Sequence, residues 1–96
     1  MELLSGLSIQ VLSTDPNFTV DGVTVVATDG SYSETLMNYP ENGDNYFYGA
    51  SERAGSYTIT VTKEGYITYE SPSPIEVRAD ECHVIPEVRD VTLVPN

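Results

Sequence analysis

GSYTITVTKEGYITY, residues 55–69, is the stretch that decides the fold of this chain. In its first half Tyr57, Ile59 and Val61 alternate with threonines, so an extended chain places the two sets on opposite faces. Such alternation of aromatic and β-branched residues is typical of a half-buried strand. Residues 63–65 then predict a turn, and residues 66–69 resume an extended run. The remaining chain is expected to supply strands that cover this one.

The other strand candidates are separated by turn residues, and no segment has the period of a helix. Asp29-Gly30 supplies the positive φ angles of a type I′ turn, so a hairpin is predicted there. Together these features predict an all-β fold, a seven-stranded antiparallel β-sandwich. It is expected to form one domain over residues 1–96, with its core at about 7–95. The predicted strands are 7–12, 23–28, 31–37, 46–50, 55–62, 75–77 and 89–93.

The inward side of these strands predicts the core. Two polar residues beside it are expected to be structural: Arg53 pairs with a carboxylate near its loop, and the Tyr66 hydroxyl finds a backbone partner. The core is expected to fold without metal. Its predicted members are Leu7, Ile9, Val11, Val23, Val25, Tyr57, Ile59, Val61, Ile75, Val77, Val91 and Leu93.

The charge balance excludes some classes of partner. Fifteen acidic residues and four basic ones give a net charge of −11, which would repel a phosphate backbone or an anionic membrane. We therefore expect no nucleic-acid partner. The acidity serves solubility, with a cation or a basic partner as alternatives. No apolar run approaches the length of a transmembrane helix, and residues 1–4 lack the features of a signal peptide.

Catalytic chemistry is not predicted. Cys82 is the only cysteine, so an internal disulfide is excluded, and His83 is the only histidine. A zinc site needs three or four nitrogen or sulfur ligands, and a catalytic histidine needs a nucleophile and an orienting group. Cys82 is expected to be buried and to react slowly with iodoacetamide, because Asp80 and Glu81 disfavour a thiolate. We predict a protein that is not an enzyme and has no cofactor.

Two kinds of ligand remain as alternatives. Calcium prefers oxygen ligands, and two loops offer them, although neither has EF-hand spacing and the same residues also form ordinary turns. Tyr46 and Tyr48 fall on one side of their strand and are candidates for a carbohydrate or peptide surface. The calcium candidates are Asp15, Asn17 and Asp21 in the first loop, and Glu41, Asn42, Asp44 and Asn45 in the second.

Several segments resemble a known family. They are residues 23–27, Asp29-Gly30, residues 52–59, Glu64-Gly65-Tyr66 and residues 90–93, and the most specific is the Gly-x-Tyr strand followed by Gly-Tyr. They resemble carboxypeptidase regulatory-like domains, over residues 7–95. The resemblance implies a Greek-key, prealbumin-like (transthyretin-like) sandwich. It also implies an accessory module of a secreted or surface protein, or a small bacterial lipoprotein, and hence an extracytoplasmic location. It transfers no site residue.

Two functions follow as hypotheses. The first is a non-catalytic accessory or structural module that contacts a protein partner or a neighbouring domain. The second is a small-ligand module that binds carbohydrate or calcium at the 38–45 loop and the neighbouring tyrosines. A ligand that binds the folded state raises its stability, so a thermal-shift screen separates the two.

Overall fold

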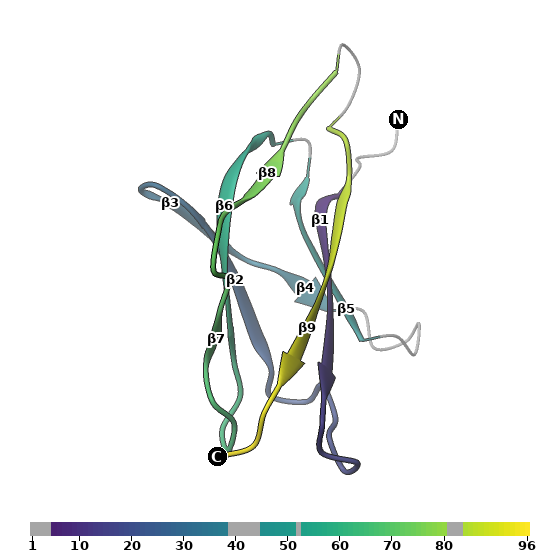
Figure 1. The fold of residues 1–96 in the computed structure, drawn as a ribbon. Helices are drawn as coiled ribbons and strands as arrows, with labels where there is room; N and C mark the ends of the chain where they lie inside the picture. The colour runs from purple at the N-terminus through teal and green to yellow at the C-terminus, as the bar shows by residue number, and fades with distance from the viewer. Residues whose placement is uncertain (1–4, 39–44, 52, 81–83) are drawn as a thin grey trace.

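A computed structural model describes residues 5–38, 45–51, 53–80 and 84–96 (Figure 1). Over these ranges the regular structure is entirely β, with nine strands in two sheets that face each other across one apolar core, as in a β-sandwich. The radius of gyration is 13.4 Å, close to the roughly 13 Å expected for about 100 residues. The all-β prediction is therefore confirmed.

The first sheet has four strands in the order β4-β5-β1-β9. They are β4 (Met37–Asn38), β5 (Tyr46–Ser51), β1 (Ser5–Ser13) and β9 (Glu87–Leu93). β1 pairs with β5 antiparallel but with β9 parallel, from Leu7 opposite Glu87 to Ser13 opposite Leu93. The prediction of purely antiparallel pairing is therefore wrong for this pair. Parallel neighbours need a long connection, and almost the whole chain connects these two.

The second sheet is organised around β6 (Gly55–Thr62), the strand predicted most clearly. β2 (Thr24–Asp29) pairs with one edge of β6, and β3 (Tyr32–Thr35) lies beyond β2. The other edge of β6 pairs with two short strands, β7 (Tyr69–Glu70) at one end and β8 (Ile75–Val77) at the other. Tyr57, Ile59 and Val61 of β6 are fully or almost fully buried, because the alternation directs all three inward.

The hairpin between β2 and β3 is confirmed, but its turn type is not. Asp29 pairs with Tyr32, so the two loop residues are Gly30 and Ser31. Gly30 has φ of 59°, and Ser31 does not have a positive φ. One positive φ at the first loop position is the pattern of a type II′ turn rather than the predicted type I′.

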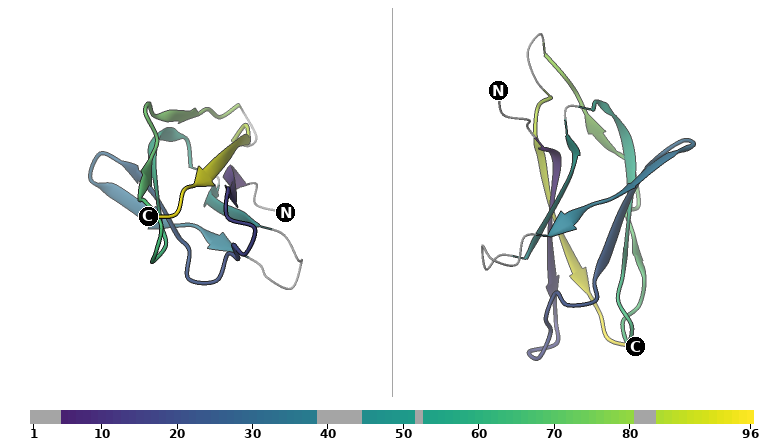
Figure 2. Two further views of the ribbon diagram at one scale, coloured as in Figure 1. Left: turned by 60° about the horizontal axis from the view of Figure 1, so that its bottom comes forward. Right: turned by 180° about the vertical axis from the view of Figure 1, so that it is seen from behind.

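The predicted strand 31–37 is interrupted at Leu36. Its first part is β3, and its last residue begins β4 in the other sheet. Leu36 is buried between them, and its N–H donates to the carbonyl of Val25 at 2.8 Å. The chain thus crosses between the sheets at this residue. Figure 2 shows the chain passing from one sheet to the other between β3 and β4. This split, together with the separate strand β7, makes nine described strands where seven were predicted.

The predicted core is confirmed except at Val23, which is only partly buried against it. The predicted core did not include several other buried residues: two lie within strands, one at the crossing, one beside Gly49 and one outside a regular strand. Among the described residues these include Ala27, Leu36, Phe47, Ala50 and Val84.

Candidate functional site

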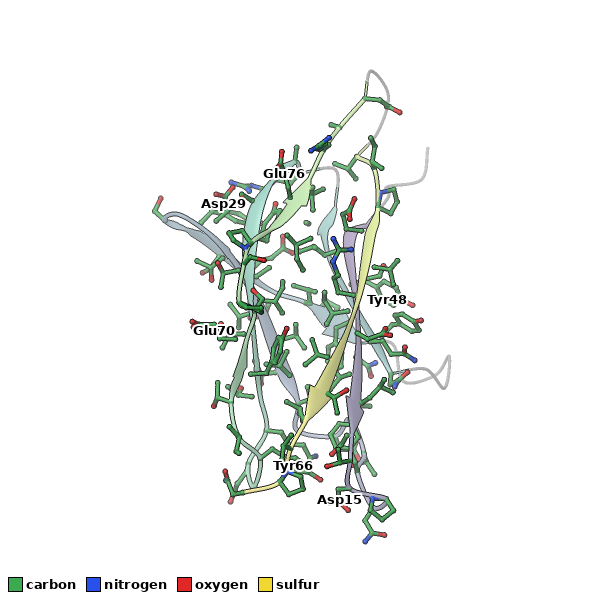
Figure 3. The ribbon with its side chains drawn as sticks, viewed as in Figure 1. Asp15, Asp29, Tyr48, Tyr66, Glu70 and Glu76 are labelled. Carbon is green, nitrogen blue, oxygen red and sulfur yellow. The ribbon has the colours of Figure 1, made fainter. Side chains whose placement is uncertain are left out.

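A row of side chains crosses the outer face of the four-stranded sheet. Met37 is opposite Tyr48, Tyr48 is opposite Ser8, and Ser8 is opposite Val88. We call these four residues the Met37–Val88 row. Met37 is 58% exposed and Val88 is 54% exposed, and Figure 3 shows Tyr48 directed away from the core. The pairing of four strands thus assembles an uncharged, mainly apolar surface from residues far apart in the sequence.

Tyr46 lies beside this row on the same face. The rings of Tyr46 and Tyr48 are stacked, with centroids 6.1 Å apart and planes inclined by 20°. Tyr46 is opposite Gln10 on β1. The predicted placement of the two tyrosines on one side of their strand is therefore confirmed, and their role as a ligand surface stays a prediction.

In the first predicted calcium loop, both carboxylate oxygens of Asp15 accept hydrogen bonds from other residues of the chain. One carboxylate oxygen of Asp15 accepts the N–H of Asn17 at 2.9 Å, and the other accepts the Tyr66 hydroxyl at 2.8 Å. The Lys63 ammonium donates to the backbone carbonyl of Asp21, which brings a positive charge to the loop. Over the described ranges, no three Asp, Glu, His or Cys residues gather as metal ligands. The Asp15 oxygens thus serve the fold of the loop, and calcium binding by Asp15, Asn17 and Asp21 stays a prediction.

The contact between Asp15 and Tyr66 joins the two sheets at one end of the sandwich (Figure 3). The Tyr66 ring packs edge-on against Phe18, with centroids 5.6 Å apart. The N–H of Asn17 and the Tyr66 hydroxyl lower the pKa of Asp15, and the Asp15 carboxylate raises the pKa of Tyr66. The predicted backbone partner of the Tyr66 hydroxyl is thus wrong, because a carboxylate 51 residues away takes its place.

Several predicted site residues lie outside the described residues. They are Glu41, Asn42 and Asp44 of the second calcium loop, together with Cys82 and His83. Asn45, at the end of that loop, is described: its side-chain amide donates to the carbonyl of Val11 at 2.8 Å and accepts from Gln10 at 3.2 Å. Asn45 therefore ties the start of β5 to β1.

Arg53 forms the predicted ion pair, and its partner is Asp29, at 3.1 Å. The same guanidinium donates to the Tyr57 hydroxyl at 2.9 Å and lies 3.7 Å from the centroid of the Tyr32 ring. The hydrogen bond to Tyr57 is the main cause that raises the pKa of Arg53, and the hydrogen bond to Asp29 is the second. A Cβ on Gly55 would lie 2.5 Å from an Asp29 carboxylate oxygen. Glycine at position 55 therefore leaves room for the Asp29 carboxylate beside Arg53.

Glu34 extends the Arg53 cluster to β5. One of its carboxylate oxygens accepts both the Tyr32 hydroxyl, at 2.9 Å, and the N–H of Ala50, at 3.0 Å. Ala50 has φ of 53°, a strained value for a residue with a side chain. The bond to Glu34 also raises the pKa of Tyr32. These polar groups form hydrogen bonds with one another, so we assign the cluster a structural role. The alternation of inward and outward residues along a strand does not reveal such a cluster.

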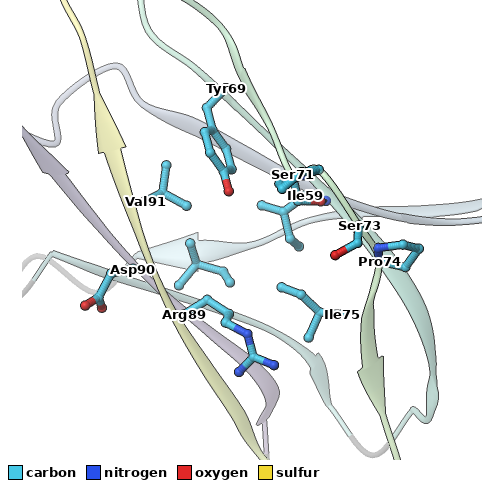
Figure 4. A pocket seen from close by; sticks show the side chains of 11 residues that line it. Ile59, Tyr69, Ser71, Ser73, Pro74, Ile75, Arg89, Asp90 and Val91 are labelled. Carbon is cyan, nitrogen blue, oxygen red and sulfur yellow. The ribbon is translucent and has the colours of Figure 1, made fainter.

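A pocket of about 240 Å³ opens between β9 and the segment that joins β7 to β8 (Figure 4). Its floor is apolar and includes Ile9, Ile59 and Ile75. Its rim is polar and includes Tyr69, Ser73, Arg89 and Asp90. Sequence reasoning treated residues 71–74 only as a break in strand pairing and did not predict this pocket.

Comparison with known protein families found no matching family, and comparison with curated proteins found no similar sequence. In the part of the chain that the structure describes, no helix is long and apolar enough to cross a membrane.

Proposed function

We propose that this chain is a non-catalytic β-sandwich module that acts by protein contact. Its contact surface is the outer face of the four-stranded sheet. The Met37–Val88 row carries this proposal, because its two end residues are each more than half exposed on one face. Methionine and tyrosine are enriched at the centres of protein interfaces, where charged residues are depleted.

The surroundings of the row favour a protein as its occupant. Leu12, 37% exposed, and Tyr46 extend the apolar surface along β1 and β5. Asp90 lies on the same face, opposite Gln10. An apolar centre beside a charged group has the anatomy of a protein interface, and the chain's net charge of −11 favours a partner that is basic at its rim.

The family resemblance supports the same reading. We propose a Greek-key, prealbumin-like arrangement of the strands and an accessory module of the carboxypeptidase regulatory-like kind. Such a module acts outside the cytoplasm, on a partner or on a neighbouring domain of its own protein. The two facing sheets and the buried β6 support this assignment.

Site-specific photo-crosslinking in the source cells tests the proposal. A photoreactive phenylalanine at Tyr48 is expected to crosslink one discrete protein. The same group at Thr58, on the outer face of the other sheet, serves as the matched control. Equal crosslinking from both positions, or none from Tyr48, contradicts the proposed surface.

Carbohydrate binding is the second candidate, because the stacked pair of Tyr46 and Tyr48 offers aromatic faces to a sugar ring. A glycan that binds there raises the melting temperature, and Tyr48→Ala abolishes the increase. Calcium is expected to produce no increase through the first loop, because the Asp15 oxygens are already bonded to Asn17 and Tyr66; an increase with calcium would favour the 38–45 loop instead.

A further inference from the structure

Backbone pairing closes one long side of the sandwich at both ends. At one end Ala79 pairs with Val84, and the N–H of Ile85 donates to the carbonyl of Arg78 at 2.7 Å. At the other end Tyr66 pairs with Pro95, supported by bonds between residues 65–67 and 94–96. The pocket described above lies between these two closures. We call this opening the β9 window.

The residues of the segment 71–74 explain why no strand of this segment covers the β9 window. The N–H of Ser71 donates to the carbonyl of Ile59, and the Ser71 Oγ accepts the N–H of Ile59, so Ser71 is engaged with β6. Pro72 and Pro74 follow, and proline has no N–H to donate to a ladder. This segment therefore does not pair with β9 across the opening.

One side of the window is an unpaired sheet edge. Among the described strands, β9 is the last of its sheet and pairs with β1 on one side only. Alternate N–H and C=O groups of an edge strand point away from the sheet and can accept an added strand. Figure 4 shows Val91 of β9 facing the opening, with Ser73 and Ile75 across from it.

The volume of the pocket indicates the size of the group that it can hold. Its volume of about 240 Å³ is below the roughly 300–1,000 Å³ of pockets for drug-sized ligands. It suits one aliphatic side chain, and its floor of isoleucines favours such a group.

The charged side chains on the strands beside the window indicate the charge that a ligand should carry. Four carboxylates lie on β7, β8 and β9, which border it; one guanidinium group lies on β9 and another directly follows β8. Arg89 already pairs with Glu87 at 3.0 Å, and Arg78 lies 3.5 Å from Glu76. Glu70 and Asp90, on the outer faces of the two strands beside the window, complete the acidic set, and a cationic ligand complements the surplus at the outer rim.

We propose that the β9 window binds an extended cationic peptide segment. The segment adds as a strand to the edge of β9, inserts one aliphatic side chain into the pocket, and carries lysine or arginine on either side of it. The peptide binds the outer edge and the inward side of β9, whereas the Met37–Val88 row uses the outward side of the sheet, so each proposal can fail without the other.

The test uses a fluorescein-labelled peptide of eight residues in which lysine and threonine alternate around one central leucine. Fluorescence anisotropy is expected to show saturable binding. Replacing the leucine with asparagine is expected to weaken binding at least about tenfold. Methylating the backbone nitrogens that face β9 removes ladder hydrogen bonds and is expected to abolish binding.

Two protein variants localise the site. Ser73→Trp fills the mouth of the pocket and is expected to weaken binding at least about tenfold. Ser33→Trp is the matched control, because it places the same side chain at an exposed position on β3 and is expected to leave binding unchanged. On the parent protein, the peptide is expected to shift the amide NMR signals of Arg89 and Val91. This measurement decides the question even if Ser73→Trp fails to fold.

Four results would overturn the proposal. The first is the absence of saturable binding. The second is an affinity that stays the same when the central leucine is replaced and is lost at high salt concentration, because such binding reflects only non-specific electrostatic attraction. The third is a set of shifted NMR signals at Met37, Tyr48 and Ser8 without shifts at Arg89 and Val91. The fourth is a dimer of the chain that forms through the β9 edge and excludes the peptide.

Discussion

The outer faces of the two sheets differ in the side chains that they present to solvent. The five-stranded sheet presents hydroxyl groups in register: Thr58 is opposite Thr28, and Thr28 is opposite Ser33. The four-stranded sheet presents the Met37–Val88 row, with Tyr46 and Leu12 on the same face. The inner faces do not differ in this way, because both are apolar and buried.

This difference shows which surface the fold leaves available for contact. Threonine suits a pleated sheet and remains compatible with water, so the hydroxyl face needs no partner. Exposed methionine, tyrosine and valine add nothing to the core, and gathered apolar residues on a surface often mark an interaction site. The four-stranded face is therefore the one to test for binding, and the five-stranded face is its natural control.

The largest expected effect tests the alternation that separates inner from outer residues. Ile59→Ala is expected to destabilise the protein by about 2–5 kcal/mol, because it leaves a cavity in the core. Thr60→Ala, one residue along on the outer face, should change stability by no more than about 0.5 kcal/mol. Urea unfolding measures both. Similar values for the two variants would contradict the assignment of the faces.

The next effect concerns the hairpin that builds the hydroxyl face. Gly30→Val is expected to destabilise the protein by more than about 1 kcal/mol, because valine resists a positive φ. No atom lies within 4 Å of a Cβ placed there, so the effect comes from the backbone alone. Gly30→Asn is the control and should be milder in thermal unfolding, since asparagine tolerates this conformation. A neutral Gly30→Val would refute the turn.

A smaller, pH-dependent effect is expected where the two sheets are joined by Asp15 and Tyr66. The pKa of Asp15 is lowered in the fold, so the contact stabilises the protein above the unfolded pKa of about 3.9. This contribution is lost as the pH falls through the lowered folded pKa. Asp15→Asn should therefore be less stable than the parent at pH 7, and the difference should shrink in acid.

Tyr66→Phe provides the control for this contact. It keeps the ring against Phe18 but removes the hydroxyl that Asp15 accepts. Part of the pH dependence should disappear, and the part due to the Asn17 N–H should remain. A stability difference between parent and Asp15→Asn that stays constant from pH 7 to strong acid would contradict this account.

The smallest effect on stability is expected from converting one face into the other. Met37→Thr and Val88→Thr give the four-stranded sheet a hydroxyl surface, and each should change stability by no more than about 0.5 kcal/mol. Crosslinking from Tyr48 should nevertheless be lost. If it persists in the double variant, contact through the Met37–Val88 row is refuted.

Local pattern was sufficient for most of the strands and most of the core. Residues 55–62 form β6 with the predicted faces, and Tyr57 and Val61 are fully buried. Arg53 finds a carboxylate, as predicted. The strands and their faces depend on alternation, which is readable along the chain, whereas the partner of Arg53, Asp29, lies 24 residues away and was not identified from sequence.

The candidate sites were less predictable from sequence. Tyr46 and Tyr48 were identified because they lie two residues apart on one strand. Met37 and Val88 were not, because they join Tyr48 only through the pairing of four strands. The Ser-Pro-Ser-Pro segment predicted a break in pairing, but not a pocket beside it.

The sequence by itself determined that the chain forms strands, which residues face inward, and where the main hairpin turns. Alternation and turn chemistry are local, so they need no knowledge of the partner strand. Only the tertiary structure decided the parallel pairing of β1 with β9, the crossing at Leu36 and the β9 window. These depend on contacts between residues distant in the chain, and a one-dimensional pattern does not specify which strands meet.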